Sequence, residues 1–350
     1  MRIDLDRAVA DTVHLESLPG AVELLLQQCH DIGAPVMTAI RRAGDSVVLD
    51  HHGPLRELAG LRMFSALSLV LGEDPITALR QSRAVGVLGA LGTTDIGFRV
   101  DPLPDRWDLR DRISAALGWR NDPRDWQVNV TRSGDLLLGQ VGPLHRSSRF
   151  PAMSRLPAST NPVVAAMMVE LLKVSPGDVV YDPFCGSGTL LVETLANDCT
   201  DVLLGSDISP VALAAAAANR RLFATAPVLR ADAARLPVVT NSVDRVIANL
   251  PFGKRVGSHA DNTVLYPAFL AELNRVLRAD GRAVLLTEDK TLFRRSVAAA
   301  AGLRVLREVQ LASGGLHPSA FVIERTRTAR GRATPANRRP PRRPARPSGS

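Results

Sequence analysis

The chain has 350 residues, of which 45% are hydrophobic and 22% charged, and this composition excludes a protein that is disordered throughout. No segment has the roughly 18–20 consecutive apolar residues that a membrane-spanning helix needs, and the first residues lack the basic-then-apolar order of a secretion signal. The three cysteines form no spaced cluster, which disfavours a disulfide framework and a structural zinc site. We therefore expect a soluble, cytoplasmic, metal-free protein, with a monomer slightly favoured.

The net charge of +8 comes from the C-terminal end of the chain. Nine arginines and no acidic residue follow residue 324, so residues 1–324 have a net charge of −1. Residues 329–350 are rich in arginine and proline and poor in apolar side chains, which predicts a disordered tail. The tail could contact phosphates or serve as a solubilising extension. The total charge therefore does not show that the folded part binds nucleic acid.

The first 152 residues alternate short strands and helices. The order predicts a small split β-α-β domain over 1–75 and a second α+β region over 76–152. Strands are expected at 13–16, 46–50, 66–71, 97–100, 126–131 and 135–141, and helices at 19–29, 54–61, 78–91 and 108–117.

Residues 153–328 contain repeated β-α-β units, which predict a mostly parallel sheet covered by helices on both faces. Strands are expected at 178–182, 201–207, 228–232, 243–249, 282–286, 304–311 and 320–325, and helices at 187–196, 209–223, 266–277 and 292–300. The predicted class is therefore an α/β, Rossmann-like domain preceded by an α+β region.

A glycine-rich segment, DPFCGSGT at 182–189, lies where a predicted strand ends and a helix begins. Gly186 and Gly188 allow the backbone to approach a ligand, and the first N–H groups of the helix favour an anionic group. The third glycine of a dinucleotide fingerprint would fall at Leu191, which disfavours nicotinamide binding. The alternative is a tight turn without a ligand.

Two carboxylates follow the next strands. Asp207 lies 19 residues after Gly188, where an acid typically accepts hydrogen bonds from ribose hydroxyls. It could instead cap a helix, but Ser209 followed by Pro210 fits that role. Asp232 could accept from an adenine amino group or be a surface turn residue.

The segment 249–252 follows the fourth strand with the sequence NLPF. The side-chain oxygen of Asn249 and the carbonyl of Leu250 could both accept from one planar amino group, Pro251 stiffens the turn, and Phe252 offers a face for stacking. Two cations that could hold phosphates come next: Lys254 and Arg255.

These side chains end successive strands. Asp182, Asp207, Asp232 and Asn249 follow one another in strand order. In a parallel sheet such ends line one crevice, where ligands bind. The sequence therefore predicts one site that contains all four residues.

DPFCGSGT resembles the cofactor loop of class I S-adenosylmethionine-dependent methyltransferases, and NLPF resembles the N/D-P-P-Y/F signature of enzymes that methylate exocyclic amines. With GSDISP and ADAARLP, these segments resemble the THUMP-containing tRNA guanine-N2-methyltransferases over about residues 155–325. Leu250 departs from the commoner proline. The resemblance implies a seven-stranded sheet, S-adenosyl-L-methionine as cofactor, tRNA as partner, and direct in-line methyl transfer to a flipped-out base in the acceptor stem. It also implies further cofactor contacts: Phe184, Thr189, Ile208 and Ala233.

The same resemblance extends toward the N-terminus. It places Ser159 and Thr160 near the methionine end of the cofactor, although Asn161 with Pro162 could make this segment a helix cap only. Residues 1–75 and 76–152 resemble a ferredoxin-like domain and a THUMP domain that hold the tRNA acceptor end. Two arginines of this region are implied to contact RNA: Arg146 and Arg149.

Several alternatives stay open at this point. The amine-binding turn could serve guanine N2 of ribosomal RNA, adenine N6 of DNA, or a glutamine side chain of a protein. A catalytically inactive RNA-binding module and a dehydrogenase are alternatives of other classes. Cys185 could be a nucleophile, but its position in the cofactor loop favours a small packing residue.

Overall fold

The computed structural model describes residues 3–145, 152–196, 200, 202–223, 226–252, 259–312 and 314–326. The predicted roles of Arg146, Arg149, Lys254, Arg255 and the tail at 329–350 lie outside these residues. Within the described ranges, no helix combines the length and apolarity needed to cross a membrane. The same ranges contain no group of three or more histidine, cysteine or acidic side chains that could hold a metal ion.

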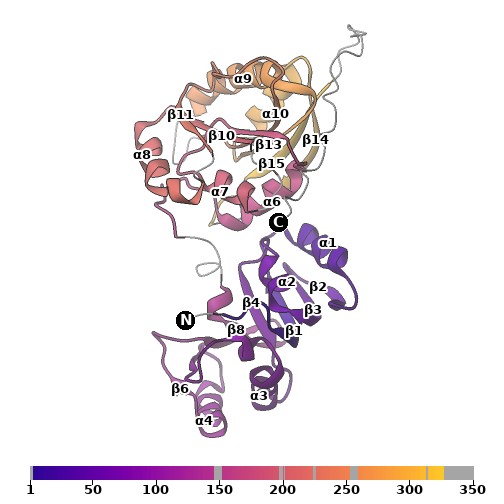
Figure 1. The fold of residues 1–350 in the computed structure, drawn as a ribbon, viewed down its shortest axis with the longest axis vertical. Helices are drawn as coiled ribbons and strands as arrows, with labels where there is room; N and C mark the ends of the chain where they lie inside the picture. Colours follow the sequence, from indigo (N-terminus) through magenta and orange to yellow (C-terminus); the bar gives the residue numbers. More distant parts are fainter. Residues whose placement is uncertain are drawn as a thin grey trace, which may run out of the picture.

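The N-terminal half is built on an eight-stranded sheet with the order β2-β3-β1-β4-β8-β7-β5-β6 (Figure 1). Its strands are β1 (Ala8–Glu16), β2 (Met37–Ala43), β3 (Ser46–Pro54), β4 (Ala66–Val70), β5 (Gly97–Val100), β6 (Arg120–Asn121), β7 (Val128–Ser133) and β8 (Leu136–Val141). Its helices are α1 (Val22–Ile32), α2 (Leu55–Gly60), α3 (Pro75–Val85) and α4 (Arg106–Leu117), with 3-10 turns η1 (Val87–Ala90) and η2 (Gly142–Leu144).

The expected strands and helices of this half are present, and the sequence analysis missed β2 and β6. The helix expected at 78–91 is divided, because α3 ends at Val85 and η1 follows. β4 pairs with β8, so one sheet continues across the boundary expected after residue 75. The division into a ferredoxin-like and a THUMP-like domain stays a prediction.

The second half contains a seven-stranded sheet with the order β11-β10-β9-β12-β13-β15-β14. Only β15 runs antiparallel to its neighbours, which confirms the mostly parallel sheet expected from the sequence. The strands are β9 (Val179–Asp182), β10 (Val202–Asp207), β11 (Val228–Arg230), β12 (Val243–Asn249), β13 (Leu277–Thr287), β14 (Leu303–Gln310) and β15 (Ser319–Arg325). The helices are α6 (Pro162–Leu172), α7 (Thr189–Leu195), α8 (Pro210–Asn219), α9 (His259–Val276) and α10 (Lys290–Ala299), with a 3-10 turn η3 (Arg220–Leu222).

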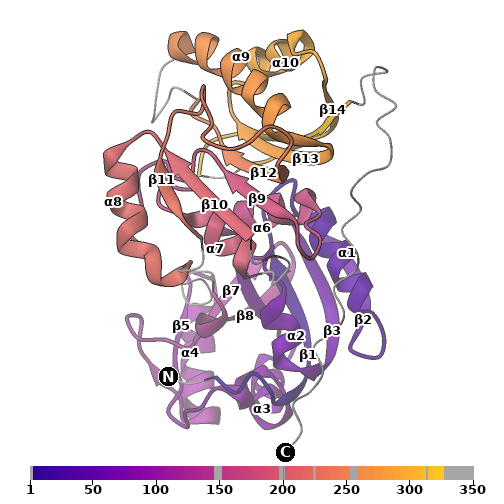
Figure 2. The same cartoon turned by 45° about the horizontal axis from the view of Figure 1, so that its top comes forward.

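The two halves pack against each other through α1 and α6, which are neighbours in both Figure 1 and Figure 2. Gln28 of α1 donates a hydrogen bond to Glu170 of α6 at 3.3 Å. A Cβ at Gly20 would lie 2.0 Å from the carbonyl oxygen of Gln310 in β14, so only glycine allows this approach. One buried apolar cluster contains residues of both halves, among them Leu25 and Leu311. The halves therefore share a core.

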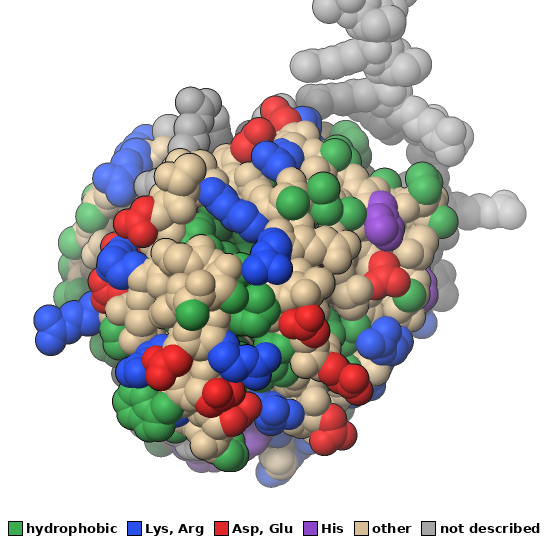
Figure 3. All heavy atoms as spheres, turned by 90° about the horizontal axis from the view of Figure 1, so that it is seen from below, with side chains coloured by type: hydrophobic (Ala, Val, Ile, Leu, Met, Phe, Trp, Pro, Cys, Tyr) green, Lys and Arg blue, Asp and Glu red, His purple; other side chains and the backbone are tan. Residues whose placement is uncertain are grey.

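The face of the N-terminal half shown in Figure 3 carries basic and acidic side chains side by side. On α4, Arg112 pairs with Asp108 and Arg110 with Asp111. This mixture agrees with the near-neutral charge of residues 1–324 and gives this face no large patch of one sign.

Candidate functional site

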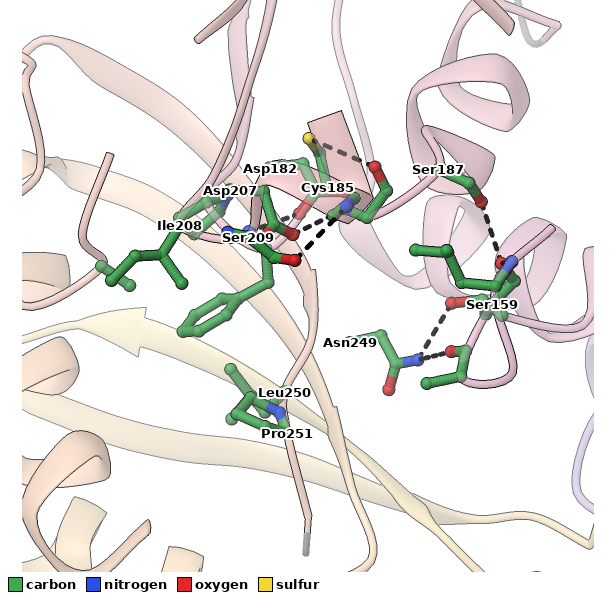
Figure 4. Close-up of a pocket in the computed structure, with 18 of the residues that line it drawn as sticks. Ser159, Asp182, Cys185, Ser187, Asp207, Ile208, Ser209, Asn249, Leu250 and Pro251 are labelled. Carbon is green, nitrogen blue, oxygen red and sulfur yellow. Dashed lines mark hydrogen bonds between the residues drawn. The ribbon is translucent and has the colours of Figure 1, made fainter. Parts of the chain in front are cut away.

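The carboxyl ends of β9, β10, β11 and β12 surround a cavity of about 470 Å³ (Figure 4). This volume falls in the range of small-molecule sites, roughly 300–1,000 Å³. The prediction that the four strand ends form one crevice is confirmed. The predicted residues that line the cavity are Ser159, Thr160, Asp182, Phe184, Gly186, Thr189, Asp207, Ile208, Asp232, Ala233, Asn249, Leu250, Pro251 and Phe252.

Backbone N–H groups of the loop after β9 donate hydrogen bonds to the two carboxyl groups at the ends of β9 and β10. The backbone N–H of Phe184 donates to Asp182 Oδ1 at 3.0 Å, and that of Gly186 donates to Asp207 Oδ2 at 2.9 Å. Gly186 has a φ of 53°, a conformation that favours glycine. The loop thus joins the ends of β9 and β10 beneath the cavity.

Gly188 is placed differently from the expectation. It does not line the cavity, and a Cβ at this position would lie 2.6 Å from the ring of Phe223. Its φ of 88° is also unfavourable for other residues. Glycine is needed here because the loop packs closely against Phe223, the residue that follows η3.

We expect Gly188→Ala to destabilise the protein by about 1–3 kcal/mol, because the added methyl group overpacks the contact with Phe223. Gly177→Ala is the matched control, since Gly177 has a similar φ of 84° and nothing within 4 Å of the added Cβ. Urea unfolding of both variants measures the difference. Equal losses would show that backbone strain, and not the contact with Phe223, accounts for the effect.

Asp207 is held in place at the end of β10. Its Oδ1 accepts from the N–H of Ser209 at 2.9 Å, and its Oδ2 from Gly186, which leaves each oxygen capacity for a second hydrogen bond. Ser209 caps α8, as predicted, by accepting from the N–H of Ala212. Beside this carboxylate the cavity is apolar, with Ile208 59% and Val211 68% exposed. The site can therefore take a hydroxylated ring next to a planar apolar group.

Asp182 is fully buried, and its Oδ2 has no hydrogen-bond partner among the described residues. Burial raises the pKa of this carboxyl well above its ordinary value, the charge of Asp207 raises it further, and the N–H of Phe184 opposes both. The hydroxyl oxygen of Thr189 is also buried and has no hydrogen-bond partner among the described residues. These two groups mark the part of the cavity where a polar ligand would supply the missing hydrogen bonds.

The raised pKa of Asp182 makes stability depend on pH. Above the ordinary value of 3.8, the folded protein keeps a proton that the unfolded chain has released, so the free energy of unfolding falls as pH rises. Asp182→Asn keeps an acceptor for Phe184 and removes this titration. We therefore expect the variant to melt above the wild type at pH 8, with the difference shrinking toward pH 4, in thermal unfolding without ligand. Asp232→Asn, at an exposed position of the same cavity, is the control. Parallel pH profiles of wild type and Asp182→Asn would contradict the expectation.

Asp232 is exposed, and its Oδ1 accepts from the N–H of Ala234 at 2.9 Å. It lines the cavity at the end of β11, so the structure leaves its predicted role open. Ala233 beside it is buried.

Asn249 presents a free acceptor to the cavity. Its Nδ2 donates to the carbonyl of Ala158 at 3.3 Å and to Thr160 Oγ1 at 3.1 Å. Its Oδ1 is buried and accepts no hydrogen bond from the described residues. Figure 4 shows the nitrogen directed toward the segment of Ser159 and the oxygen on the opposite side. The side chain can therefore accept a hydrogen bond from a ligand.

Two hydrogen bonds hold the backbone of the turn after Asn249. Leu250 donates its N–H to the carbonyl of Leu286 at 2.9 Å, and the hydroxyl of Tyr266 donates to the carbonyl of Pro251 at 2.6 Å. Burial raises the pKa of Tyr266 to about 12, so its phenol keeps the proton that it donates. The turn is thus anchored to β13 and α9.

Ser159 and Thr160 contact different parts of the site. The hydroxyl of Ser159 lies 2.9 Å from that of Ser187 in the loop after β9 and accepts from the N–H of Leu156. Thr160 contacts Asn249 instead. Asn161 caps α6 as predicted, so the capping reading also holds. The sequence analysis missed Ser187 and Ala158; the latter acts through its carbonyl, which no side-chain pattern could indicate.

Cys185 is 5% exposed, and burial, with the charges of Asp182 and Asp207, raises the pKa of its thiol. The thiolate form that a nucleophile requires is therefore disfavoured. This supports the packing role.

The family model described as "RMKL-like, methyltransferase domain" matches residues 153–319. A tRNA (guanine(6)-N2)-methyltransferase of Thermus thermophilus is 36% identical over 78% of this chain and 75% of that protein. The bovine "tRNA (guanine(6)-N(2))-methyltransferase THUMP3" is 34% identical over 63% of this chain and 47% of its own length, so the chain spans about half of this mammalian relative. The crystal structure of TrmN from Thermus thermophilus superimposes with a TM-score of 0.71 at 27% identity, covering 90% of this chain and 99% of that one.

The family model covers the second half alone, whereas the Thermus thermophilus relative and the TrmN structure match 78% and 90% of the chain and so extend over both halves. None of these matches supports the dehydrogenase alternative. The sheet order, the cavity at the strand ends and the anchored Asn249 turn agree with them. The chain therefore belongs to the family of class I RNA methyltransferases that includes the tRNA (guanine-N2)-methyltransferases.

Proposed function

We propose that the protein transfers a methyl group from S-adenosyl-L-methionine to the N2 amino group of a guanine in tRNA, in the acceptor stem. The relatives named above supply the substrate class. The observation that carries the proposal is the buried Oδ1 of Asn249, which faces the cavity with no hydrogen-bond partner among the described residues.

The cavity suits this cofactor. Two buried polar atoms without a partner in the described ranges line the part beside the loop after β9: Asp182 Oδ2 and Thr189 Oγ1. Asp207 would hold the ribose hydroxyls, Ile208 and Val211 would cover the adenine, and Asp182 Oδ2 would accept a hydrogen bond from the ammonium group. The cofactor supplies a methyl group on a sulfonium, which is already an excellent donor.

The protein's task is to orient and activate a weak nucleophile. The lone pair of guanine N2 is delocalised into the ring, and an acceptor for one of its hydrogens draws the pair toward nitrogen. Asn249 Oδ1 is that acceptor, and the carbonyl of Leu250 is proposed as the second. The methyl group would pass from sulfur to N2: the N–C bond would form as the C–S bond breaks, the electron pair of the C–S bond would stay on sulfur, and N2 would release its proton to water. Positioning by this fixed turn supplies most of the acceleration.

The base must first leave its stack, which costs a few kcal/mol. Phe252 lines the cavity next to Asn249, and stacking of the base on its ring would return roughly 1–3 kcal/mol. The N-terminal half is proposed to hold the tRNA acceptor end, and its shared core with the methyltransferase half supports a fixed distance between the two. A cytoplasmic location and a monomeric state stay predictions.

The test is to incubate the protein with labelled S-adenosylmethionine and unmodified tRNA, digest the RNA and identify the methylated nucleoside by mass spectrometry. N2-methylguanosine in the acceptor stem is the expected product. Label in ribosomal RNA or DNA but not in tRNA would contradict the proposed substrate and support the proposed methyl transfer. Failure to bind the cofactor at all would favour the inactive RNA-binding module.

A further inference from the structure

We propose that Thr160 is a positioning residue that makes the site selective for an amino group, because its hydroxyl, together with the carbonyl of Ala158, holds the Asn249 side-chain amide in one orientation. This inference rests on the proposed function and adds a determinant of its specificity. Thr160 was expected to contact the cofactor, and the geometry assigns it a second partner.

The orientation of the amide follows from its neighbours. The carbonyl of Ala158 can only accept hydrogen bonds, so the group that faces it at 3.3 Å must be the nitrogen of Asn249. Thr160 Oγ1 lies 3.1 Å from the same nitrogen and takes its second hydrogen. Both amide hydrogens are thereby used within the protein.

The oxygen of Asn249 is then the only hydrogen-bonding atom of this amide that is left for a ligand, and it can only accept. An exocyclic amino group donates to it. The carbonyl oxygen of a base would be repelled, because both oxygens carry a partial negative charge and neither can donate a hydrogen bond. A site built to satisfy one hydrogen-bonding pattern rejects the opposite one strongly, because its buried polar groups would be left unpaired. Rotating the amide by half a turn would reverse this preference.

Thr160 is well placed to prevent that rotation. It is 8% exposed and directly precedes Asn161, whose side chain caps α6 through the N–H of Val163. The adjacent Ser159 has separate partners, Leu156 and Ser187. Two neighbouring hydroxyls of one segment therefore have different contacts, and a pair of variants can separate them.

The experiment compares Thr160→Val, which keeps the shape and removes the acceptor, with Thr160→Ser, which keeps the hydroxyl. Single-turnover methylation of tRNA gives the rate, and calorimetry gives the dissociation constant for S-adenosylhomocysteine. We expect Thr160→Val to lower the rate roughly 2- to 12-fold, the value of one net hydrogen bond, and to change cofactor affinity less than Ser159→Ala does. Thr160→Ser should restore the rate. Ser159→Ala should instead weaken cofactor binding, since it removes the contact with the cofactor loop.

A wild-type rate in Thr160→Val would overturn the inference, and so would an equal loss of cofactor affinity in Thr160→Val and Ser159→Ala. A second readout does not require turnover. In protein labelled with ¹⁵N-asparagine, the Asn249 amide hydrogens should exchange slowly in wild type and Thr160→Ser and fast in Thr160→Val. Thr160→Ala replaces the valine variant if that one does not fold. An inactive wild type with this exchange pattern would sink the proposed function and leave the positioning role of Thr160 standing.

Discussion

Asn249→Ala should lower methyl transfer by roughly 100–1,000-fold or more, the range for loss of one preorganised hydrogen-bonding group aimed at a reacting centre. The variant removes the only side-chain atom of the 249–252 turn that the cavity offers as a buried acceptor within the described residues. Leu250 and Pro251 keep their anchors on β13 and α9, so the turn itself should persist. Single-turnover kinetics with saturating cofactor and tRNA measures the loss.

Cofactor binding is the internal control for this variant. The side chains of Asp182 and Asp207 are held by the loop after β9 and not by Asn249, so the dissociation constant for S-adenosylhomocysteine should change less than about threefold. Activity near that of the wild type would remove Asn249 from the mechanism. A parallel loss of cofactor binding would show that the side chain shapes the pocket and does not act on the base.

The ends of the parallel strands could be predicted from the sequence because their signals are local. A polar residue that ends an apolar run marks the edge where a strand ends. Asp182 and Asn249 directly follow apolar residues, and Asp207 follows Gly205 and Ser206 at the end of β10. The cap at Ser209 followed from two adjacent residues. Topology then brought these separate signals to one cavity.

Features that depend on distant contacts escaped the sequence analysis. Gly188 was expected to approach a ligand, yet its constraint is the ring of Phe223, 35 residues away in the chain. The first turns of α9 were missed because His259 and its neighbours are polar and show no apolar period. Thr160 and Asn249 meet only once the fold is complete. In each case the missing information lay in the tertiary structure.

Arg62→Ala should destabilise the protein by about 3–5 kcal/mol, because it leaves a buried carboxylate without its guanidinium. Arg62, between α2 and β4, forms two parallel hydrogen bonds with Glu193 of α7, one of them 2.8 Å long. The Glu193 side chain is only 2% exposed and that of Arg62 21%. Since α7 follows the cofactor loop directly, this pair links the N-terminal half to the site. Urea and thermal unfolding measure the loss.

Two comparisons separate a buried charge from a general loss of packing. Arg56→Ala breaks a pair with Asp6 in which both side chains are more than half exposed, and such pairs contribute at most about 1 kcal/mol. Adding Glu193→Gln to Arg62→Ala removes the buried charge that has lost its guanidinium, so the double variant should recover much of the stability. If Arg62→Ala cost no more than Arg56→Ala, the pair would not join the two halves. If the double variant were as unstable as the single one, the loss would come from the packing of the arginine stem and not from the charge of Glu193.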